Sequence, residues 1–151
     1  MAVRVSFYDM TGPTGKRRVT DAEFARLLEF RNGLRRFLHW SDTQAKQAGL
    51  TGAQYQLLLA IRGHEGRPSV GDVAAHLLLR HHSAVELVDR AERAGLLRRV
   101  ADDTDQRVVR LELTADGDAR LAELAVAHLE ELSRVRPSFE VLWKHLPDST
   151  R

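Results

Sequence analysis

Apolar residues recur every three or four positions along most of this chain, which is the spacing of one buried helix face. The first such run follows Thr20, a typical helix N-cap, with Glu23 placed to complete a capping box. The apolar residues of this run are Phe24, Leu27, Leu28, Phe30, Leu34, Phe37, Leu38 and Trp40. The stripe is broader than one core face needs. The helix predicted over 20–48 therefore buries its extra side either in a central core or against a partner subunit.

Two more capping boxes predict the starts of two shorter helices. The pairs are Thr51 with Gln54 and Ser69 with Asp72. The apolar residues of the first of these helices are Tyr55, Leu58, Leu59 and Ile61. Two glycines and a proline within 63–68 separate the helices. Residues 67–69 are expected to add a short third strand to the sheet predicted further on.

The stretch 69–113 changes from helical to strand spacing after Gly95, a residue suited to a left-handed helix cap. Its short first helix leads through a turn at 78–80 into a second helix. The buried stripe of the second helix is Ala84, Leu87, Val88, Ala91 and Ala94. Strands follow at 96–100 and 108–113, joined by a polar tip. This order predicts a winged helix-turn-helix, whose second helix fits a DNA major groove.

Thr114 is the expected N-cap of a final long helix, along which leucines recur at steps of three and four. Pro137 cannot continue a helix without losing a hydrogen bond, so the pattern predicts a break and a short last helix. The apolar residues of that last helix are Phe139, Leu142, Trp143 and Leu146. Two amphipathic helices here must bury their stripes. A dimer interface shared with the helix at 20–48 achieves this, and folding back on the same subunit is the alternative.

Composition favours one soluble globular domain, with 151 residues, 43% of them hydrophobic and 29% charged. The absence of cysteine excludes disulfides, cysteine–zinc sites and thiol chemistry. No apolar run reaches the roughly 18 residues of a membrane span, and no signal peptide pattern is present, so we expect a cytoplasmic protein without membrane contact. Residues 16–36 carry seven basic and three acidic side chains, whereas residues 112–148 carry four and eight. This asymmetry favours a polyanionic partner.

The predicted fold is therefore mainly α-helical with a small β-wing. A winged helix-turn-helix at 50–113 is flanked by N- and C-terminal dimerisation helices at 20–48 and 114–147. Residues 1–19 are interpreted as a flexible arm, because glycine and proline interrupt them. Their basic end can touch phosphate, although a solvated tail is the simpler interpretation.

The second helix of the motif presents polar side chains opposite its buried stripe, and the N-terminal part of such a helix contacts base edges. The guanidinium of Arg80 has two parallel N–H donors, which can bond guanine O6 and N7 together. Glu86 repels phosphate but can accept a hydrogen bond from cytosine N4. The candidate DNA-binding residues of this helix are Arg80, His81, His82, Ser83, Glu86 and Arg90. An ordinary solvated helix face is the alternative interpretation.

Three segments stand in unbroken order, LVDRAERAGLLRR at 87–99, Asp105-Gln106-Arg107, and LELTADG at 111–117. In this combination the chain resembles the MarR family of bacterial transcription regulators, from about residue 50 to 124 and with fitting flanking helices. The resemblance implies a homodimer. The chain departs from the family's pattern at Val85 and Glu86, where small polar residues and a basic residue are common. That departure affects the operator sequence and the individual base contacts rather than the fold.

The resemblance also assigns roles in the wing. In the family the arginine of an Asp-x-Arg motif enters the minor groove and the aspartate orients it, which here implies Arg107 and Asp105. Arginine suits the enhanced negative potential of a narrow minor groove. A surface salt bridge of little energetic value is the plainer interpretation. The expected phosphate contacts nearby are Arg98, Arg99 and Arg110.

Other site chemistry is limited. By resemblance, an effector pocket is expected between the dimer helices and the winged domain, although helical spacing equally suits a plain core. The candidate pocket residues are Phe37, Trp40, Tyr55 and Leu58. The histidines at 64, 76, 81 and 82 match no zinc spacing, so no metal site or cofactor is predicted. The chain has no catalytic motif and is not expected to be an enzyme.

The predicted function is a MarR-like regulator, in the first instance a repressor. It binds double-stranded DNA at a pseudo-palindromic operator as a homodimer, and a small-molecule effector releases it. The alternative is a winged-helix protein-interaction module that does not bind DNA. Acidic residues near the reading surface keep this alternative open, namely Glu86, Asp89, Glu92, Asp102 and Asp103. The salt dependence of binding distinguishes the two functions, because affinity for DNA falls steeply as the salt concentration rises.

Overall fold

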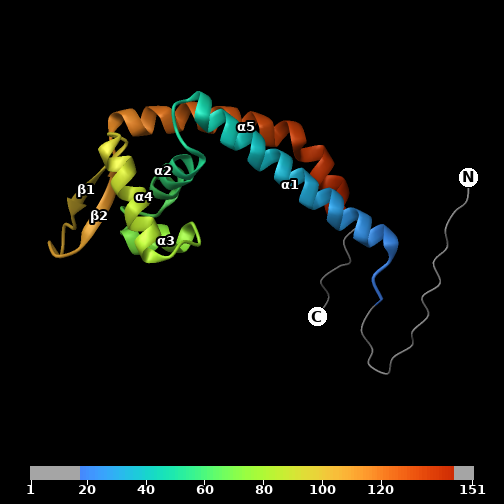
Figure 1. Ribbon diagram of the computed structural model, residues 1–151, viewed down its shortest axis with the longest axis horizontal. Coiled ribbons are helices and arrows are strands. Elements are labelled where there is room, and N and C mark those ends of the chain that lie inside the picture. Colours follow the sequence, from blue (N-terminus) through green and yellow to red (C-terminus); the bar gives the residue numbers. More distant parts are fainter. Residues whose placement is uncertain (1–17, 145–151) are drawn as a thin grey trace, which may run out of the picture.

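Within residues 18–144, which the computed structural model describes, the chain forms five helices and one β-hairpin. The elements are α1 (Asp21–Gln47), α2 (Gly52–Gly63), α3 (Val70–His76), α4 (His81–Arg93), β1 (Leu97–Ala101), β2 (Val109–Leu113) and α5 (Ala115–Lys144). Figure 1 shows α1 and α5 side by side in opposite directions, with the other elements gathered at one end of this helical pair. The predicted mainly α-helical fold with a β-wing is confirmed.

Some predictions fall outside the described residues. The arm at 1–17 and the end of the dimerisation region at 145–147 are among them. No helix within 18–144 combines the length and the apolar character of a membrane span.

The predicted helix caps are confirmed. Each capping box has both of its hydrogen bonds, the hydroxyl accepting from a backbone N–H and the acidic or amide side chain accepting from the N-cap N–H. These boxes are Thr20 with Glu23, Thr51 with Gln54 and Ser69 with Asp72. At the start of α5 the Thr114 hydroxyl accepts from the Gly117 N–H at 3.1 Å. Gly95 follows α4 with a φ of 74°, the left-handed cap that its position predicts.

The core lies in the winged domain, where α2 packs against α4, α5 and the hairpin. Its largest fully buried side chains are Leu57, Leu58, Leu96, Leu97, Leu111, Val73, Val88 and Pro68. The antiparallel hairpin pairs Leu97 with Leu113 and Ala101 with Val109. Leu97 and Leu111, on one face of the hairpin, are buried against the helices, whereas Arg98 on the other face is exposed. A rigid domain of this kind holds α4 and the hairpin in a fixed relation.

Two expectations about the sheet are corrected. The first strand begins at Leu97 rather than at residue 96, and the second begins at Val109 rather than at 108. Residues 67–69 form no strand; instead the Leu111 N–H donates one hydrogen bond of 2.8 Å to the Pro68 carbonyl. The next residue, Ser69, already serves as the N-cap of α3, so the chain turns away before a ladder can form.

The predicted break at Pro137 is wrong, because α5 continues through it to Lys144. Packing against α1 outweighs the lost backbone hydrogen bond. The Phe30 ring lies edge-on to Phe139 and Trp143, with centroids 5.9 and 5.5 Å apart. Gly33 leaves room for this contact, because a Cβ there would lie 3.2 Å from Phe139 Cζ. The C-terminal part of α5 is thereby held to α1.

Leu78, in the turn before α4, adopts a φ of 53°, which a leucine side chain tolerates poorly. The side chain is 92% exposed, so its removal loses almost no packing. We expect Leu78→Gly to raise the free energy of unfolding by about 0.5–1 kcal/mol, as measured by urea denaturation. Leu79→Gly, next in the chain and without a positive φ, is the control and is expected to lower it. A less stable Leu78→Gly protein would contradict this account.

Candidate nucleic-acid interface

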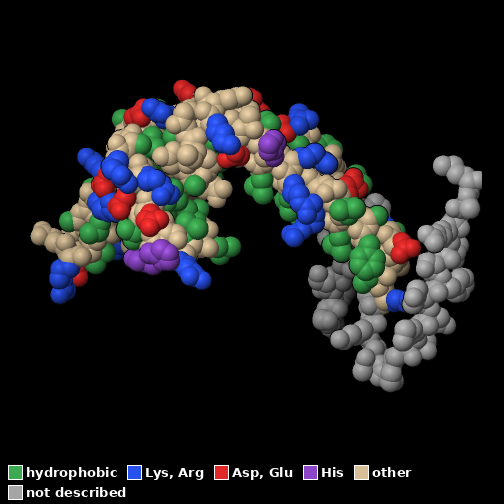
Figure 2. Space-filling view, viewed as in Figure 1, with side chains coloured by type: hydrophobic (Ala, Val, Ile, Leu, Met, Phe, Trp, Pro, Cys, Tyr) green, Lys and Arg blue, Asp and Glu red, His purple; other side chains and the backbone are tan. Residues whose placement is uncertain are grey.

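Helix α4 separates its buried and exposed faces sharply. Ala84, Leu87, Val88 and Ala91 are buried against the domain. The N-terminal end of the opposite face is formed by Arg80, the N-cap residue, followed by His81 and His82, all three exposed. Figure 2 shows histidine and basic side chains close together over the winged end of the molecule. The start of the helix therefore presents hydrogen-bond donors to the surroundings.

Five of the predicted contact residues on and just before α4 have no polar side-chain partner within residues 18–144. In the described part of the chain, no hydrogen bond or ion pair of a side chain involves Arg80, His81, His82, Glu86 or Arg90. Ser83 is half-buried. A guanidinium without an internal partner retains all five of its donors for a ligand. The predicted residues of this helix thus lie on one accessible surface.

The wing tip holds Arg107 in a defined orientation. Its Nε and Nη2 donate to the two carboxylate oxygens of Asp105 at 3.0 and 3.2 Å, and its backbone N–H donates to Asp105 Oδ1 at 3.1 Å. The side-chain and backbone hydrogen bonds from Arg107 lower the pKa of Asp105. The Arg107 side chain is nevertheless 90% exposed. The bidentate pair orients the exposed guanidinium, whose remaining N–H donors are available to an incoming polyanion.

Asp102 organises the wing tip and was not among the predicted site residues. Its carboxylate accepts from the Thr104 hydroxyl at 2.6 Å, from the Thr104 and Asp105 N–H groups, and from Arg110 Nε at 2.7 Å. These bonds, the Thr104 hydroxyl first, hold the pKa of Asp102 far below its usual range. An aspartate that accepts from the N–H two residues on is the Asx-turn pattern, a signal available in the sequence.

Asp102 makes the wing sensitive to acid. Because its folded-state pKa is lowered, its contribution to stability is present above the unfolded pKa of about 3.9 and is lost as pH falls below that value. We expect Asp102→Asn to be less stable than the wild type at neutral pH. The difference should shrink near pH 3, where the carboxyl of the unfolded chain is largely protonated while that of the folded protein is still ionised. Urea denaturation at both pH values measures this, and a pH-independent difference would contradict it.

The three predicted phosphate contacts differ in availability. Arg98 is 63% exposed and lies 3.3 Å from Glu112, whereas the side chains of Arg99 and Arg110 are only 29% exposed. Arg99 bonds the Asp89 and Glu92 carboxylates and so ties β1 to α4. Arg110 bonds Asp102 within the wing at 2.7 Å and lies 3.8 Å from Asp72 of α3. Arg98 is the most accessible of the three, and the other two brace the wing against the helices.

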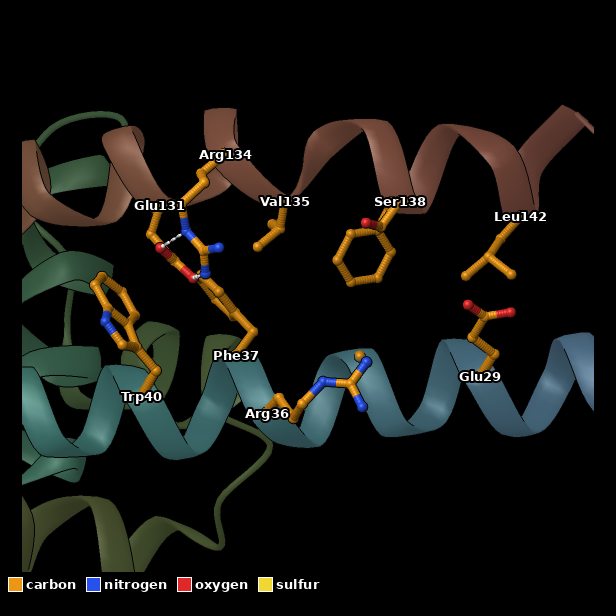
Figure 3. A pocket seen from close by; sticks show the side chains of 11 residues that line it. Glu29, Arg36, Phe37, Trp40, Glu131, Arg134, Val135, Ser138 and Leu142 are labelled. Atoms are coloured by element: carbon orange, nitrogen blue, oxygen red, sulfur yellow. Dashed lines mark hydrogen bonds and ion pairs between the residues drawn. The ribbon is translucent and has the colours of Figure 1, made fainter.

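The four predicted effector residues do not share one cavity. Tyr55 and Leu58 are buried in the core, whereas Phe37 and Trp40 line an open cavity of about 320 Å³ between α1 and α5. Figure 3 shows Phe37 and Trp40 on α1 below Glu131 and Arg134 of α5, which are joined by hydrogen bonds of 2.5 and 2.7 Å. The remaining lining residues are Glu29, Gly33, Arg36, Val135, Ser138, Phe139 and Leu142.

His128 separates the two halves of the predicted pocket and was not anticipated from the sequence. It is 6% exposed, and its ring stacks on Tyr55 with centroids 4.4 Å apart. Its Nδ1 lies 2.7 Å from the Leu124 carbonyl, which can only accept, so Nδ1 carries the proton. Its Nε2 then accepts from the Ser41 hydroxyl at 2.7 Å. This residue joins the helical pair to the winged domain.

Comparison with known proteins agrees with this geometry. A sequence profile described as MarR family matches residues 48–108, which include α2 to the wing tip. A MarR family protein from Bacillus stearothermophilus has the same fold, with a TM-score of 0.68 and 26% identity over 81% of this chain and 85% of that one. The winged part of the chain, at residues 48–108, is thus similar to the MarR family. The resemblance of the three sequence segments is therefore confirmed.

Two MarR-type relatives come from Bacillus subtilis (strain 168). The HTH-type transcriptional repressor MdtR is 28% identical over 93 residues, covering 62% of this chain and 59% of that protein. The HTH-type transcriptional regulator YsmB is 30% identical over 74 residues, covering 49% and 51%. This chain thus spans about half the length of the curated relatives that it matches.

Two further solved structures share the fold and contain ligands. One is a variant of S. aureus MepR bound to an oligodeoxyribonucleotide, with a TM-score of 0.59 and 22% identity over 83% of this chain and 85% of that one. The other is CouR from Rhodococcus jostii RHA1 bound to p-coumaroyl-CoA, with a TM-score of 0.63 and 23% identity over 85% and 82%. At these identities the likeness establishes the fold alone.

Proposed function

We propose that this protein is a MarR-type transcription regulator, in the first instance a repressor, that binds double-stranded DNA. The observation that carries the proposal is the pairing of two exposed elements on one rigid domain. Helix α4 presents unpartnered donors, and the wing tip presents Arg107 held by Asp105. The MepR variant bound to an oligodeoxyribonucleotide shares the fold, which supports DNA as the ligand.

The two elements suit different grooves. Helix α4 enters the major groove with its N-terminal end, where Arg80 and the two following histidines reach base edges. The wing places Arg107 in the flanking minor groove, where a narrow width concentrates negative potential. Arg98 adds a phosphate contact, which fixes position without reading sequence. Specificity then rests on α4 and affinity on both elements.

We further propose that the protein acts as a homodimer through α1 and α5. Both helices carry large apolar side chains that are about half exposed among the described residues, namely Phe24, Leu27, Leu28, Leu38, Val126, Leu129, Leu132, Val141 and Trp143. A two-fold interface over these faces removes them from water and pairs two copies of α4 for a pseudo-palindromic operator. Sedimentation equilibrium tests this: twice the chain mass is expected, and a monomer at the concentrations that bind DNA would contradict it.

A small-molecule effector is a further part of the proposal, supported by the ligand-bound CouR structure. The cavity between α1 and α5 combines the Phe37 and Trp40 rings with Arg36, which forms no hydrogen bond or ion pair within the described residues. A ligand bound there releases DNA if it favours a dimer in which the two copies of α4 are wrongly spaced. As a DNA-binding regulator, the protein is proposed to act in the cytoplasm.

The alternative function, a protein-interaction module, rests on acidic residues near the reading surface. Most of these carboxylates have arginine partners. Asp89 and Glu92 bind Arg99, and Asp102 and Asp103 bind Arg110 and Arg67. Within residues 18–144, Glu86 is the one of these five acidic residues that has no arginine partner, so the exposed face of α4 carries little net acidity. This pairing favours DNA over a basic protein partner.

Fluorescence anisotropy tests the proposal. The protein is titrated against a labelled duplex from upstream of its own gene and against an unrelated duplex, at two salt concentrations. A regulator should bind the cognate duplex more tightly and lose affinity steeply with salt through counterion release. If that duplex is not preferred, selection from sheared genomic DNA identifies the bound sequence. Weak, unselective binding after both steps would contradict the proposal.

A further inference from the structure

Two histidines from different elements meet at the corner between α2 and α3. His64 is the C-cap residue of α2, and His76 is the last residue of α3. Nδ1 of His64 lies 3.1 Å from Nε2 of His76, and the rings are nearly perpendicular, at 81°. His64 is half-buried and His76 is exposed, so solvent reaches the pair. DNA binding by α4 and the wing does not require this contact.

The distance between the two nitrogens is close to the distance between two nitrogen ligands bound to one metal ion. Zn²⁺ holds imidazole nitrogens at about 2.0–2.1 Å, which places two neighbouring ligands roughly 3–3.4 Å apart. A neutral His64 can carry its proton on Nε2, and a neutral His76 can carry its proton on Nδ1. The facing atoms, His64 Nδ1 and His76 Nε2, then both present lone pairs, and a cation takes the place of the proton in their hydrogen bond.

The surroundings favour a cation. Asp72 lies one helical turn before His76 on α3, and its charge interacts with His64. Arg62, two residues before His64, is paired with Asp118 at 3.2 Å, and Arg110 lies 3.8 Å from the Asp72 carboxylate and shares its charge. His76 also lines a surface hollow of about 380 Å³, which leaves space for coordinated water. Within the described residues no group of three or more metal-ligating side chains occurs, so the protein supplies two ligands.

We propose that His64 and His76 form a two-imidazole site for a borderline divalent transition-metal cation such as Zn²⁺ or Ni²⁺, with water completing its coordination. A bound cation ties the end of α2 to the end of α3. Helix α3 packs directly against α4, so the cation stiffens the helix-turn-helix at its base. The site binds only the folded state, since a loop of several residues separates the two histidines in the unfolded chain.

Thermal unfolding of the full chain with Zn²⁺, Ni²⁺ or Mg²⁺ tests the site, with EDTA as the reversal. At about one hundred times the Kd, Zn²⁺ and Ni²⁺ should raise the midpoint by about 5–10 °C, and the hard cation Mg²⁺ should not. The shift should disappear in His64→Gln and in His76→Gln. It should persist in the control His81→Gln/His82→Gln, which removes the other two neighbouring histidines.

A second readout identifies the ligands directly. Paramagnetic Ni²⁺ should broaden the imidazole NMR signals of His64 and His76 before those of His81 and His82. Because this measurement uses the wild-type protein, it identifies the ligands even if a histidine substitution changes the thermal stability for another reason. Absence of both effects in the wild-type protein would overturn the proposal. Equal stabilisation by Zn²⁺ after His76→Gln would also overturn it, by placing the metal elsewhere.

Discussion

Gly117→Ala is expected to lower the free energy of unfolding by about 3 kcal/mol, the largest stability change predicted for a single added methyl group. Gly117 is buried in the first turn of α5. A Cβ there would lie 1.9 Å from the Leu96 carbonyl oxygen, which is backbone and cannot rotate away. The start of α5 must then move off the α4–β1 junction. The hydrogen bond from the Thr114 N–H to Leu96, 3.1 Å long, would be lost with it.

Gly63→Ala is the matched control for this prediction. Gly63 ends α2, and a Cβ there would meet nothing within 4 Å. Because alanine has the higher helix propensity, we expect stability to be unchanged or slightly raised. Urea denaturation of both variants measures how the same glycine-to-alanine change affects the free energy of unfolding at the two positions. Similar midpoints would show that the approach of α5 to Leu96 is looser than described.

Arg107→Ala is expected to weaken binding to the selected duplex by about 10- to 100-fold, the effect of losing one specific groove contact. The fold should not change, because the side chain is 90% exposed and its ion pair with Asp105 lies at the surface. Fluorescence anisotropy measures the affinity, and circular dichroism with sedimentation measures the fold and the assembly. Arg107→Lys keeps the charge but loses the fork, so an intermediate affinity is expected.

Arg136→Ala is the control for charge alone. It removes one exposed arginine from α5, far along the chain from the wing, where it pairs with Glu140 at 3.3 Å. Both variants have the same net charge, so a general electrostatic effect would weaken DNA binding equally in each. We expect Arg136→Ala to bind like the wild type. Wild-type affinity in Arg107→Ala would remove the wing from the mechanism.

The helix boundaries could be predicted from local signals. Capping boxes such as Thr51 with Gln54 act within three residues, and the structure contains both hydrogen bonds of each box. Gly95 was predictable for the same reason, because its left-handed backbone is a local requirement. The break at Pro137 was not. There the decision depends on Phe30 and other side chains of α1, distant in sequence.

The candidate site was predictable in part. The face of α4 follows from helical period alone, and the wing pair Asp105 and Arg107 came from the family resemblance. The spacing of residues along the sequence could not show which arginines are exposed to a ligand and which are paired with carboxylates of the same chain. Arg99 owes its low exposure to two carboxylates on α4, a contact that depends on the hairpin's position. His128 was missed because an isolated histidine on a helix face gives no sequence signal.

The central claim is that α4 and the wing tip bind DNA together, and hydrogen–deuterium exchange with the selected duplex tests it most directly. The account predicts slower exchange, on adding DNA, in peptides covering residues 80–90 and 102–110. Peptides from α2, at 52–63, should not change. An unrelated duplex at the same salt concentration should protect both regions less. Protection confined to other segments, or none at saturating DNA, would contradict the account.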